Sequence, residues 1–215
     1  MQVKLESVTP NPEATMAYIA RVSNPSNQDN PDYEKLLGYC IKHQHWSVFE
    51  HSTMSVEIET SVAIATQILR HRSFTFQQFS ARYAKVSERE IYEARRQHDN
   101  NRQLSTDDLD EATKKEFLMA QECLWESATI FYEKMIEKGV AKECARFLLP
   151  QMAKTRMYMT GNCRSWIHYI QLRTAEGVQK EHRDIALDIK KIFVEQYPTV
   201  SKALGWVESS QGEQK

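Results

Sequence analysis

The sequence predicts an α+β protein built as one domain, and the pattern of its apolar residues carries that prediction. Residues 2–8 and 52–60 alternate polar and apolar side chains, as half-buried strands do. Between residues 109 and 135, apolar side chains recur every three or four positions, which is the period of a helix. The 215 residues fit one core, so we expect a domain over 1–198 and a largely disordered tail over 199–215.

The first elements are short. The strand over 2–8 ends at two nearby prolines, and helical spacing of apolar residues follows over 13–23. A loop rich in turn formers, 24–31, precedes a second helix over 33–44. The strand over 52–60 comes next along the chain.

A third helix is predicted over 61–72, where Val62, Ala65 and Ile68 share one face. The basic stretch RHRSFTFQQFSARY, residues 70–83, therefore begins at the end of a helix and continues into a loop.

A polar loop over 99–108 leads into a long helix. Asp107, Asp108 and Asp110 suit its first turn, because acidic side chains there complement the helix dipole. Gly139 is the predicted stop, which gives a helix of roughly 45 Å. A helix of that length in a small domain often packs against a partner subunit.

The remaining elements follow in quick succession. A short helix over 141–150 ends at a proline, and a strand is predicted over 154–161. A helix over 162–173 has Asn162 as its N-cap, and a final amphipathic helix spans 178–198.

Charge and cysteine content disfavour several classes of protein. The chain has 28 basic and 29 acidic residues, whereas a general binder of nucleic acid or membrane surfaces is usually more basic. The four cysteines lack metal-finger spacing, which favours reduced thiols. The sequence shows no apolar leader and no run of about 18 apolar residues, so we expect a cytoplasmic protein, or one in the host cytoplasm if the source is viral.

Standard nucleotide and metal motifs are missing from the sequence. It contains neither the glycine fingerprint of dinucleotide-binding folds nor a P-loop. His43 and His45 are two residues apart, which places them on different sides of a helix, so we expect no metal site. Because the charge of the whole chain is balanced, any site for an anionic ligand must be formed by a local cluster of basic residues.

The stretch 70–83 concentrates positive charge in an otherwise balanced chain. A helix dipole stabilises Arg70 and Arg72 by about 0.3–1 kcal/mol each, which explains two cations at a helix end. It does not explain Ser80 and Arg82 ten residues on. Forked arginine donors that converge with a serine suit a phosphate or a planar carbonyl ligand, so the spacing favours an anion site over a solvated basic face.

Two other segments carry similar chemistry. HWSVFEH, residues 45–51, surrounds two aromatic residues with histidine, serine and glutamate, and NCRSWIHYIQLR, residues 162–173, carries asparagine, histidine and two arginines. Each has a simpler explanation, since the aromatic side chains fit a core and the arginines fit a solvated face. The joint occurrence of all three segments favours a binding site.

These segments resemble the flavin-dependent thymidylate synthases. The signature of that family is Arg-His-Arg, seven residues and Ser-x-Arg, and here Arg70-His71-Arg72 precedes Ser80-Ala81-Arg82 by that spacing. HWSVFEH is similar to the family's His-x-[Ser/Thr]-x-Phe-Glu-His segment, and ARFLLP, NCRSWIHYIQLR and VQKE are similar to its later stretches. The resemblance extends to about Pro198.

The resemblance implies a single α+β domain of the family's type, with a mixed sheet and long helices. It implies a methyltransferase that converts dUMP to dTMP in de novo dTMP biosynthesis. Methylenetetrahydrofolate is the implied carbon donor, FAD carries the reducing equivalents and NADPH reloads it. The implied assembly is a homotetramer with active sites at subunit interfaces, and no nucleic acid, membrane or metal is expected to take part.

The resemblance also implies a role for each matching residue. Arg173, which grips and polarises the pyrimidine, and His71, near the flavin, are the implied catalytic residues. Arg146 is expected to reach dUMP from a neighbouring subunit. The implied dUMP contacts are Gln67, Arg70, Gln78, Ser80, Arg82, Arg146 and Arg173. The implied FAD contacts are Ser23, Ser47, Glu50, Arg70, His71, Arg72, Gln78, Asn162, Arg164 and His168.

One position departs from the family pattern, which often has Asn-Glu where this chain has Gln77-Gln78. Gln78 keeps a carbonyl acceptor without the carboxylate charge, so a hydrogen bond to a ligand survives the change, whereas a proton-shuttling role would need the carboxylate that is absent here. We nominate no cysteine nucleophile, because Cys163 alone falls in the three segments and its neighbours match flavin positions. Arg173 is instead expected to stabilise negative charge on the pyrimidine.

Two other functions stay open on the sequence. A nucleic-acid-binding module could use Phe79 and Tyr83 to stack bases beside the basic cluster. A relative that keeps the fold without activity is the second, and Gln77-Gln78 is the only hint of it. Bound flavin would exclude the first, and tritium release from 5-tritiated dUMP would exclude the second.

Overall fold

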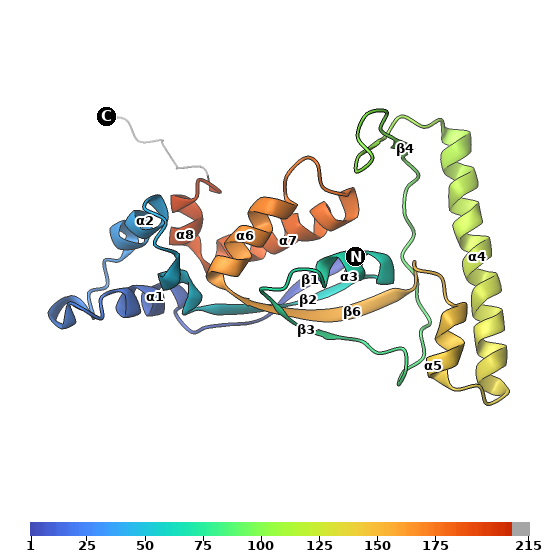
Figure 1. The fold of residues 1–215 in the computed structure, drawn as a ribbon, viewed down its shortest axis with the longest axis horizontal. Helices are drawn as coiled ribbons and strands as arrows, with labels where there is room; N and C mark the ends of the chain where they lie inside the picture. Colours follow the sequence, from blue (N-terminus) through green and yellow to red (C-terminus); the bar gives the residue numbers. More distant parts are fainter. Residues whose placement is uncertain (208–215) are drawn as a thin grey trace.

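The computed structural model describes residues 1–207 as an α+β fold around a four-stranded sheet (Figure 1). The strands lie in the order β1-β2-β6-β3. The predicted α+β class is confirmed, but the sheet is not mixed: each described neighbour pair is antiparallel, because β6 runs opposite to both β2 and β3. The strands are β1 Gln2–Val8, β2 Thr53–Ser61, β3 Thr75–Gln78 and β6 Lys154–Asn162.

Strands β2 and β6 form the centre of the sheet. Their register pairs Val56 with Met159 and Ile58 with Met157, and all four side chains are buried. Because side chains alternate along a strand, the apolar half of β2 faces the core and the polar half faces away. The strand predicted over 52–60 is confirmed.

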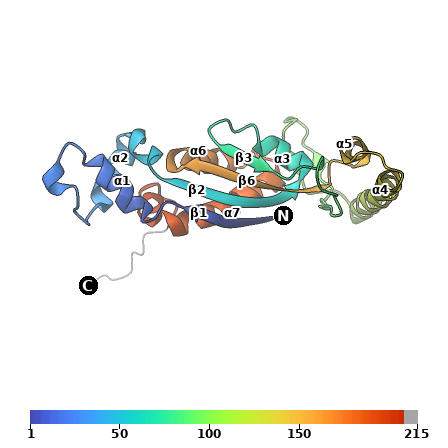
Figure 2. The same cartoon turned by 90° about the horizontal axis from the view of Figure 1, so that it is seen from below.

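Two C-terminal helices pack against the sheet (Figures 1 and 2). Helix α6, Cys163–Arg173, begins where β6 ends, and α7, Lys180–Gln196, contacts both α6 and β1. Trp166 of α6 and Phe193 of α7 are fully buried in the same core as Met159 of β6. Burial of a large apolar side chain contributes about 1.5–3 kcal/mol, so this core fixes where α6 lies over the sheet.

The other elements are shorter or lie beyond the sheet. Most helices lie where the sequence predicts them, with ends shifted by a few residues, whereas the hairpin of β4 and β5 falls partly in the stretch expected to be a loop. The helices are α1 Pro12–Ala20, α2 Glu34–Lys42, α3 Val62–Ile68, α4 Glu111–Glu137, α5 Lys142–Ala145 and α8 Pro198–Ala203. The 3-10 helices and the small hairpin are η1 Pro25–Asn27, η2 Trp46–Glu50, η3 Arg146–Leu148, β4 Arg96–Gln97 and β5 Ser105–Thr106.

The basic stretch is folded differently from its prediction. Helix α3 ends at Ile68, and the expected loop contains β3, Thr75–Gln78, which pairs with β6. Phe74 anchors the turn between α3 and β3, because its ring lies 4.6 Å from that of Trp166. The ring also packs closely on Gly161, where an added Cβ would meet Phe74 Cδ1 at 2.5 Å. Strand β3 needs few apolar residues because it lies at the edge of the sheet.

Helix α4 lies beyond one end of the sheet (Figure 1). Its 27 residues give a length of about 40 Å, and Asp110 is its N-cap. Asp107 and Asp108 were expected within the first turn, but they precede the helix and pair with Lys114 and Arg96 instead. The helix therefore starts at Glu111, after these acidic residues, because the capping side chain of Asp110 sets the start.

The folded region extends past the predicted boundary at residue 198. Helix α8 begins at Pro198, a favourable first helical residue, and its Val200 and Ser201 are buried. The backbone N–H of Val200 donates to Glu13 Oε1 at 2.8 Å, which ties α8 to α1. The predicted disordered tail is therefore wrong for α8, and its last part, residues 208–215, lies outside the described residues.

Candidate active site

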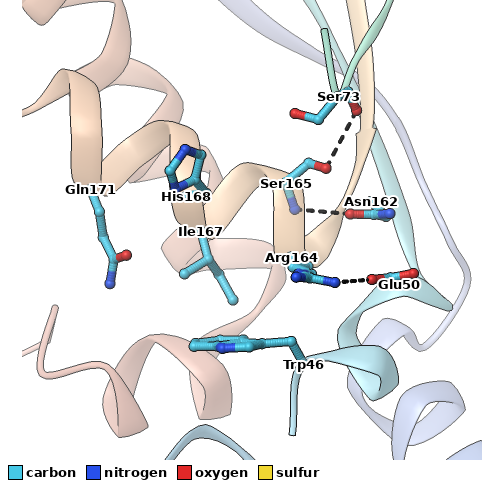
Figure 3. A pocket seen from close by; sticks show the side chains of 9 residues that line it. All are labelled: Trp46, Glu50, Ser73, Asn162, Arg164, Ser165, Ile167, His168 and Gln171. Atoms are coloured by element: carbon cyan, nitrogen blue, oxygen red, sulfur yellow. Dashed lines mark hydrogen bonds and ion pairs between the residues drawn. The ribbon is translucent and has the colours of Figure 1, made fainter. Parts of the chain in front are cut away.

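A cavity of about 610 Å³ opens between the start of α6 and the 3-10 helix η2 (Figure 3). Four of the predicted FAD contacts line it: Glu50, Asn162, Arg164 and His168. Figure 3 shows Trp46 on the opposite side of the cavity from α6, with Glu50 and Arg164 joined by an ion pair. The cavity therefore joins two segments that lie more than one hundred residues apart in the sequence.

Local hydrogen bonds hold the first turn of α6 at this cavity. Asn162 accepts a hydrogen bond from the backbone N–H of Ser165 at 2.8 Å, which confirms the predicted N-cap. The hydroxyl of Ser165 donates to the backbone carbonyl of Ser73 at 3.4 Å. This contact connects α6 to the basic stretch, so the two motif segments are placed together by the fold.

The other six predicted FAD contacts lie outside this cavity's lining: Ser23, Ser47, Arg70, His71, Arg72 and Gln78. Ser47 is exposed on η2, and Arg72 is exposed after α3. Ser23 lines a separate cavity of about 440 Å³ together with Arg21 and Asn24. Within a single chain, the structure thus brings together part of the predicted FAD set.

His71 and Arg173, the two predicted catalytic residues, are in direct contact. Arg173 donates from Nε to Nε2 of His71 at 2.9 Å, and the two residues are 102 positions apart. The His71 ring packs edge-on against Tyr169 at 4.8 Å between centroids, and the Tyr169 hydroxyl lies 3.1 Å from Nε2 of His182. Because Nε2 of His71 accepts a hydrogen bond, its proton resides on Nδ1.

The surroundings keep both histidines neutral. Burial, followed by the neighbouring charge of Arg173, lowers the pKa of His71 to about 4. The same two causes lower the pKa of His182 to about 3. At neutral pH, His71 is therefore an uncharged imidazole held in one tautomer by an arginine.

A second cavity, of about 480 Å³, collects three of the predicted dUMP contacts: Gln78, Ser80 and Arg146. Gln78 donates from Nε2 to Thr155 Oγ1 at 3.2 Å, which leaves its carbonyl oxygen as an acceptor. Where the family often has a glutamate carboxylate, this chain therefore has the amide of Gln78, whose NH2 group is already bonded to Thr155.

Arg82 is occupied by a carboxylate within the chain. Its Nε and Nη2 donate to Glu143 Oε2 at 3.1 and 3.0 Å, and both side chains are about half exposed. Ion pairs this exposed contribute little to stability, so the guanidinium is available for exchange with a stronger anion.

The predicted dUMP contacts therefore fall into two groups. Gln67, Arg70 and Arg173 lie with α3 and the end of α6, whereas Arg146 lies in η3. Figure 1 shows α5, which leads into η3, beside α4 and before the start of β6, while α6 begins after β6 ends. The 480 Å³ cavity is lined by Arg146 together with Gln78 and Ser80, and Gln67, Arg70 and Arg173 are not among its lining residues.

Several residues at these sites were missed by sequence analysis. Trp46, Ser73, Ile167 and Gln171 line the 610 Å³ cavity. All four lie within the three motif segments, and this position in the sequence was the only feature that could have identified them as site residues. Tyr169 and His182 carry no local pattern that separates them from core residues.

Residues 1–207 contain no group of three or more His, Cys, Asp or Glu side chains that could hold a metal ion. Over the same residues, no helix has both the length and the apolar character needed to cross a membrane.

The fold and the cavities define an α+β protein whose arginine, amide and aromatic side chains suit anionic ligands with planar rings. Residues 4–199 match the family model described as "Thymidylate synthase complementing protein". The chain therefore belongs to the flavin-dependent thymidylate synthase family, a family of methyltransferases and flavoproteins whose flavin is FAD.

Two relatives support this assignment. The chain is 56% identical over 196 residues to a flavin-dependent thymidylate synthase from Synechocystis sp., with 91% of each chain covered. It is 49% identical over 216 residues to a probable flavin-dependent thymidylate synthase of Paramecium bursaria Chlorella virus 1, with 96% of this chain and 100% of the relative covered.

A solved structure supports the fold. The UMP/dUMP methylase PolB from Streptomyces cacaoi, bound with 5-Br dUMP, gives a TM-score of 0.84 at 22% identity. The alignment covers 95% of this chain and 94% of that one, so the two proteins share one α+β architecture.

Proposed function

We propose that this protein converts dUMP to dTMP with methylenetetrahydrofolate as carbon donor, FAD as cofactor and NADPH as reductant. The assignment to a thymidylate synthase family supports the reaction type. The hydrogen bond from Arg173 to His71 is the observation that carries the proposal, because it joins the motif arginine-histidine pair to the helix that lines the candidate FAD cavity. Since the chain belongs to an enzyme family, we do not retain the nucleic-acid-binding alternative.

The residues of the 610 Å³ cavity fit FAD. Trp46 offers an aromatic surface for a planar ring, Arg164 offers a fork of donors for a diphosphate, and Asn162 offers an amide. Glu50 pairs with Arg164 and orients its guanidinium. FAD, when bound, supplies the hydride for the reaction.

The chain's own contribution is orientation and electrostatics. Within residues 1–207, Arg173 makes its side-chain hydrogen bond through Nε alone, so its two Nη groups can meet a pyrimidine carbonyl and stabilise charge that develops there. His71 stays neutral and holds Arg173 in place through Nε2. Arg70, Ser80 and Arg82 would hold the dUMP phosphate and deoxyribose.

A homotetramer would complete the site. Arg146 belongs to the second group of predicted dUMP contacts, so it would reach dUMP in a neighbouring subunit, and the adjacent Phe147 is 80% exposed. Helix α4 buries Trp125 and Tyr132, yet its Leu124 is 55% exposed. Such exposed apolar side chains support an interface between copies.

Two measurements test the proposed function. The purified protein should be yellow, with a flavin absorption spectrum. It should release tritium from 5-tritiated dUMP only when methylenetetrahydrofolate and NADPH are both present. A flavin-containing protein without tritium release would be the inactive relative, and release that continues without NADPH would contradict the assigned reductant.

A further inference from the structure

A chain of side-chain hydrogen bonds links Gln67 to the buried ion pair of Arg95 and Glu181. Gln67 Nε2 donates to Gln179 Oε1 at 2.6 Å, and Gln179 Nε2 donates to Glu181 Oε2 at 2.9 Å. Glu181 Oε1 accepts from Arg95 Nη2 at 2.5 Å, and Arg95 Nε donates to Ser105 Oγ at 3.0 Å. The chain of bonds thus runs from α3, past the start of α7, to the hairpin of β4 and β5.

The carboxylate of Glu181 fixes the direction of these hydrogen bonds. Glu181 is 4% exposed, and although burial raises its pKa, hydrogen bonds from Arg95 and Gln179 hold that pKa below its usual value. An ionised carboxylate only accepts hydrogen bonds. Gln179 must therefore turn its NH2 group to Glu181 and its carbonyl to Gln67, and Gln67 must donate in return.

The free end of Gln67 is consequently an acceptor. Its Nε2 is engaged by Gln179, so Oε1 is the atom left for a ligand. Gln67 lies four residues, about one helical turn, before His71, and His71 contacts Arg173, the arginine proposed to meet the pyrimidine carbonyl. If the proposed function holds, this acceptor lies at the nucleotide base.

Uracil and cytosine present opposite groups at N3. Uracil carries an N3–H donor, whereas the N3 of cytosine is an acceptor. We propose that Arg95, Glu181 and Gln179 are positioning residues that hold Gln67 as a hydrogen-bond acceptor, and that this acceptor selects uracil over cytosine nucleotides. The inference rests on the proposed function, because it places Gln67 at the base of dUMP.

Cytosine is rejected because the amides cannot turn over. A flipped Gln67 would set its carbonyl against that of Gln179, and a flipped Gln179 would set its carbonyl against the carboxylate of Glu181. An acceptor left facing an acceptor costs roughly ten- to a hundredfold in affinity. Discrimination thus depends on residues that do not touch the base.

The proposal can be tested by exchanging donor and acceptor along the hydrogen bonds between Gln67, Gln179 and Glu181. In Q67E, a carboxylate faces the carbonyl of Gln179, which Glu181 prevents from turning. In the double variant Q67E/E181Q, the amide at position 181 can accept from Arg95 and donate to Gln179, so Gln179 can turn and donate to position 67. The carboxylate at position 67 then still offers an acceptor to N3–H.

Binding of dUMP and dCMP to the FAD-loaded enzyme is measured by isothermal titration calorimetry. Wild type should bind dUMP at least about tenfold more tightly than dCMP, Q67E should lose about tenfold in dUMP affinity, and E181Q added to Q67E should restore affinity to within about threefold of wild type. A purely structural role for Glu181 predicts no such rescue. A double variant that binds dUMP no better than Q67E, or a wild type that binds both nucleotides equally, overturns the proposal.

A second variant covers the case in which changes at position 181 prevent folding. Q179M keeps the side-chain volume but removes both hydrogen bonds, so the dUMP preference over dCMP should narrow by about tenfold. Q196M, the same change at the other end of α7, is the control and should keep the wild-type preference. An unchanged preference in Q179M also overturns the proposal. Absence of dUMP binding in folded wild type would overturn the proposed function itself, and this inference with it.

Discussion

Arg173 donates a hydrogen bond from Nε to Nε2 of His71 at 2.9 Å, across 102 positions of sequence. Both residues were nominated from the sequence for catalytic roles, and the fold brings them into contact at the end of α3 and of α6. Burial and the charge of Arg173 lower the pKa of His71 and keep it uncharged, and the bond engages Nε of Arg173 while leaving its Nη groups for a ligand. Our first prediction concerns this pair.

Arg173→Ala should lower kcat by about 100-fold or more and weaken dUMP binding, because it removes the donors proposed to meet the pyrimidine. Steady-state kinetics and dUMP titration measure both effects. Arg102→Ala, a change in the exposed loop between β4 and β5, is the control. Near-normal turnover of the Arg173 variant would exclude its proposed role.

Arg82→Ala should raise the KM for dUMP about ten- to a hundredfold, and more than the KM for folate, because a charge-assisted contact of about 1.5–3 kcal/mol is lost. Glu143→Ala removes the same internal ion pair but keeps the arginine, so it should not raise the KM for dUMP. An equal rise in both variants would show that the ion pair matters, and not a contact from Arg82 to the phosphate.

Arg164→Ala should weaken FAD binding about ten- to a hundredfold, because Arg164 lines the candidate FAD cavity and offers charge-assisted hydrogen bonds. The ratio of flavin to protein absorbance after dialysis measures the loss. Arg102→Ala serves again as control. Full flavin retention by the Arg164 variant would place the FAD diphosphate elsewhere.

Acid pH should destabilise the protein through His71 and His182. Burial and Arg173 lower their pKa values from 6.5 to about 4 and about 3, so below pH 6.5 the unfolded chain binds more protons than the folded one. The stability is complete above about pH 6.5 and falls as the pH falls, by up to about 2 kcal/mol per histidine at pH 5.

Urea unfolding between pH 4.5 and 7.5 measures this dependence. His182→Gln should flatten the profile, whereas the same change at exposed His43 should leave its slope unaltered. A variant at His182 with the wild-type slope would show that this histidine is not the source.

Leu124→Glu should break the proposed tetramer into smaller species and abolish activity, because it places a charge in an apolar stripe of α4. Phe117, Leu124 and Phe131 are seven residues apart and 44, 55 and 57% exposed. Light scattering coupled to size exclusion measures the mass. Glu126→Lys, on the opposite side of α4, should stay tetrameric; wild type that runs as a monomer would contradict the proposed assembly.

Periodic burial and local capping explain what could be predicted from the sequence. The alternation of β2 and the N-cap of α6 at Asn162 were both predictable, because each depends on neighbours within a few residues. Strand β3 was missed since its partner, β6, lies about eighty residues away and an edge strand carries a weak apolar pattern. Helix α8 was missed because its burial depends on contacts with α1 and α2.

The candidate site shows the same division. The spacing of Arg70, His71, Arg72, Ser80 and Arg82 identified the family by itself, because a fixed set of donors at fixed spacing is a property of the chain. The sequence therefore determined the fold class and the reaction, and it supplied the predicted site residues.

Only the tertiary structure decided how those residues meet. It placed His71 against Arg173, divided the predicted dUMP contacts between two regions of one chain, and joined Gln67 through Gln179 to a buried carboxylate. The physical reason is that hydrogen-bond direction and charge burial depend on packing between segments about one hundred residues apart, which no local pattern records.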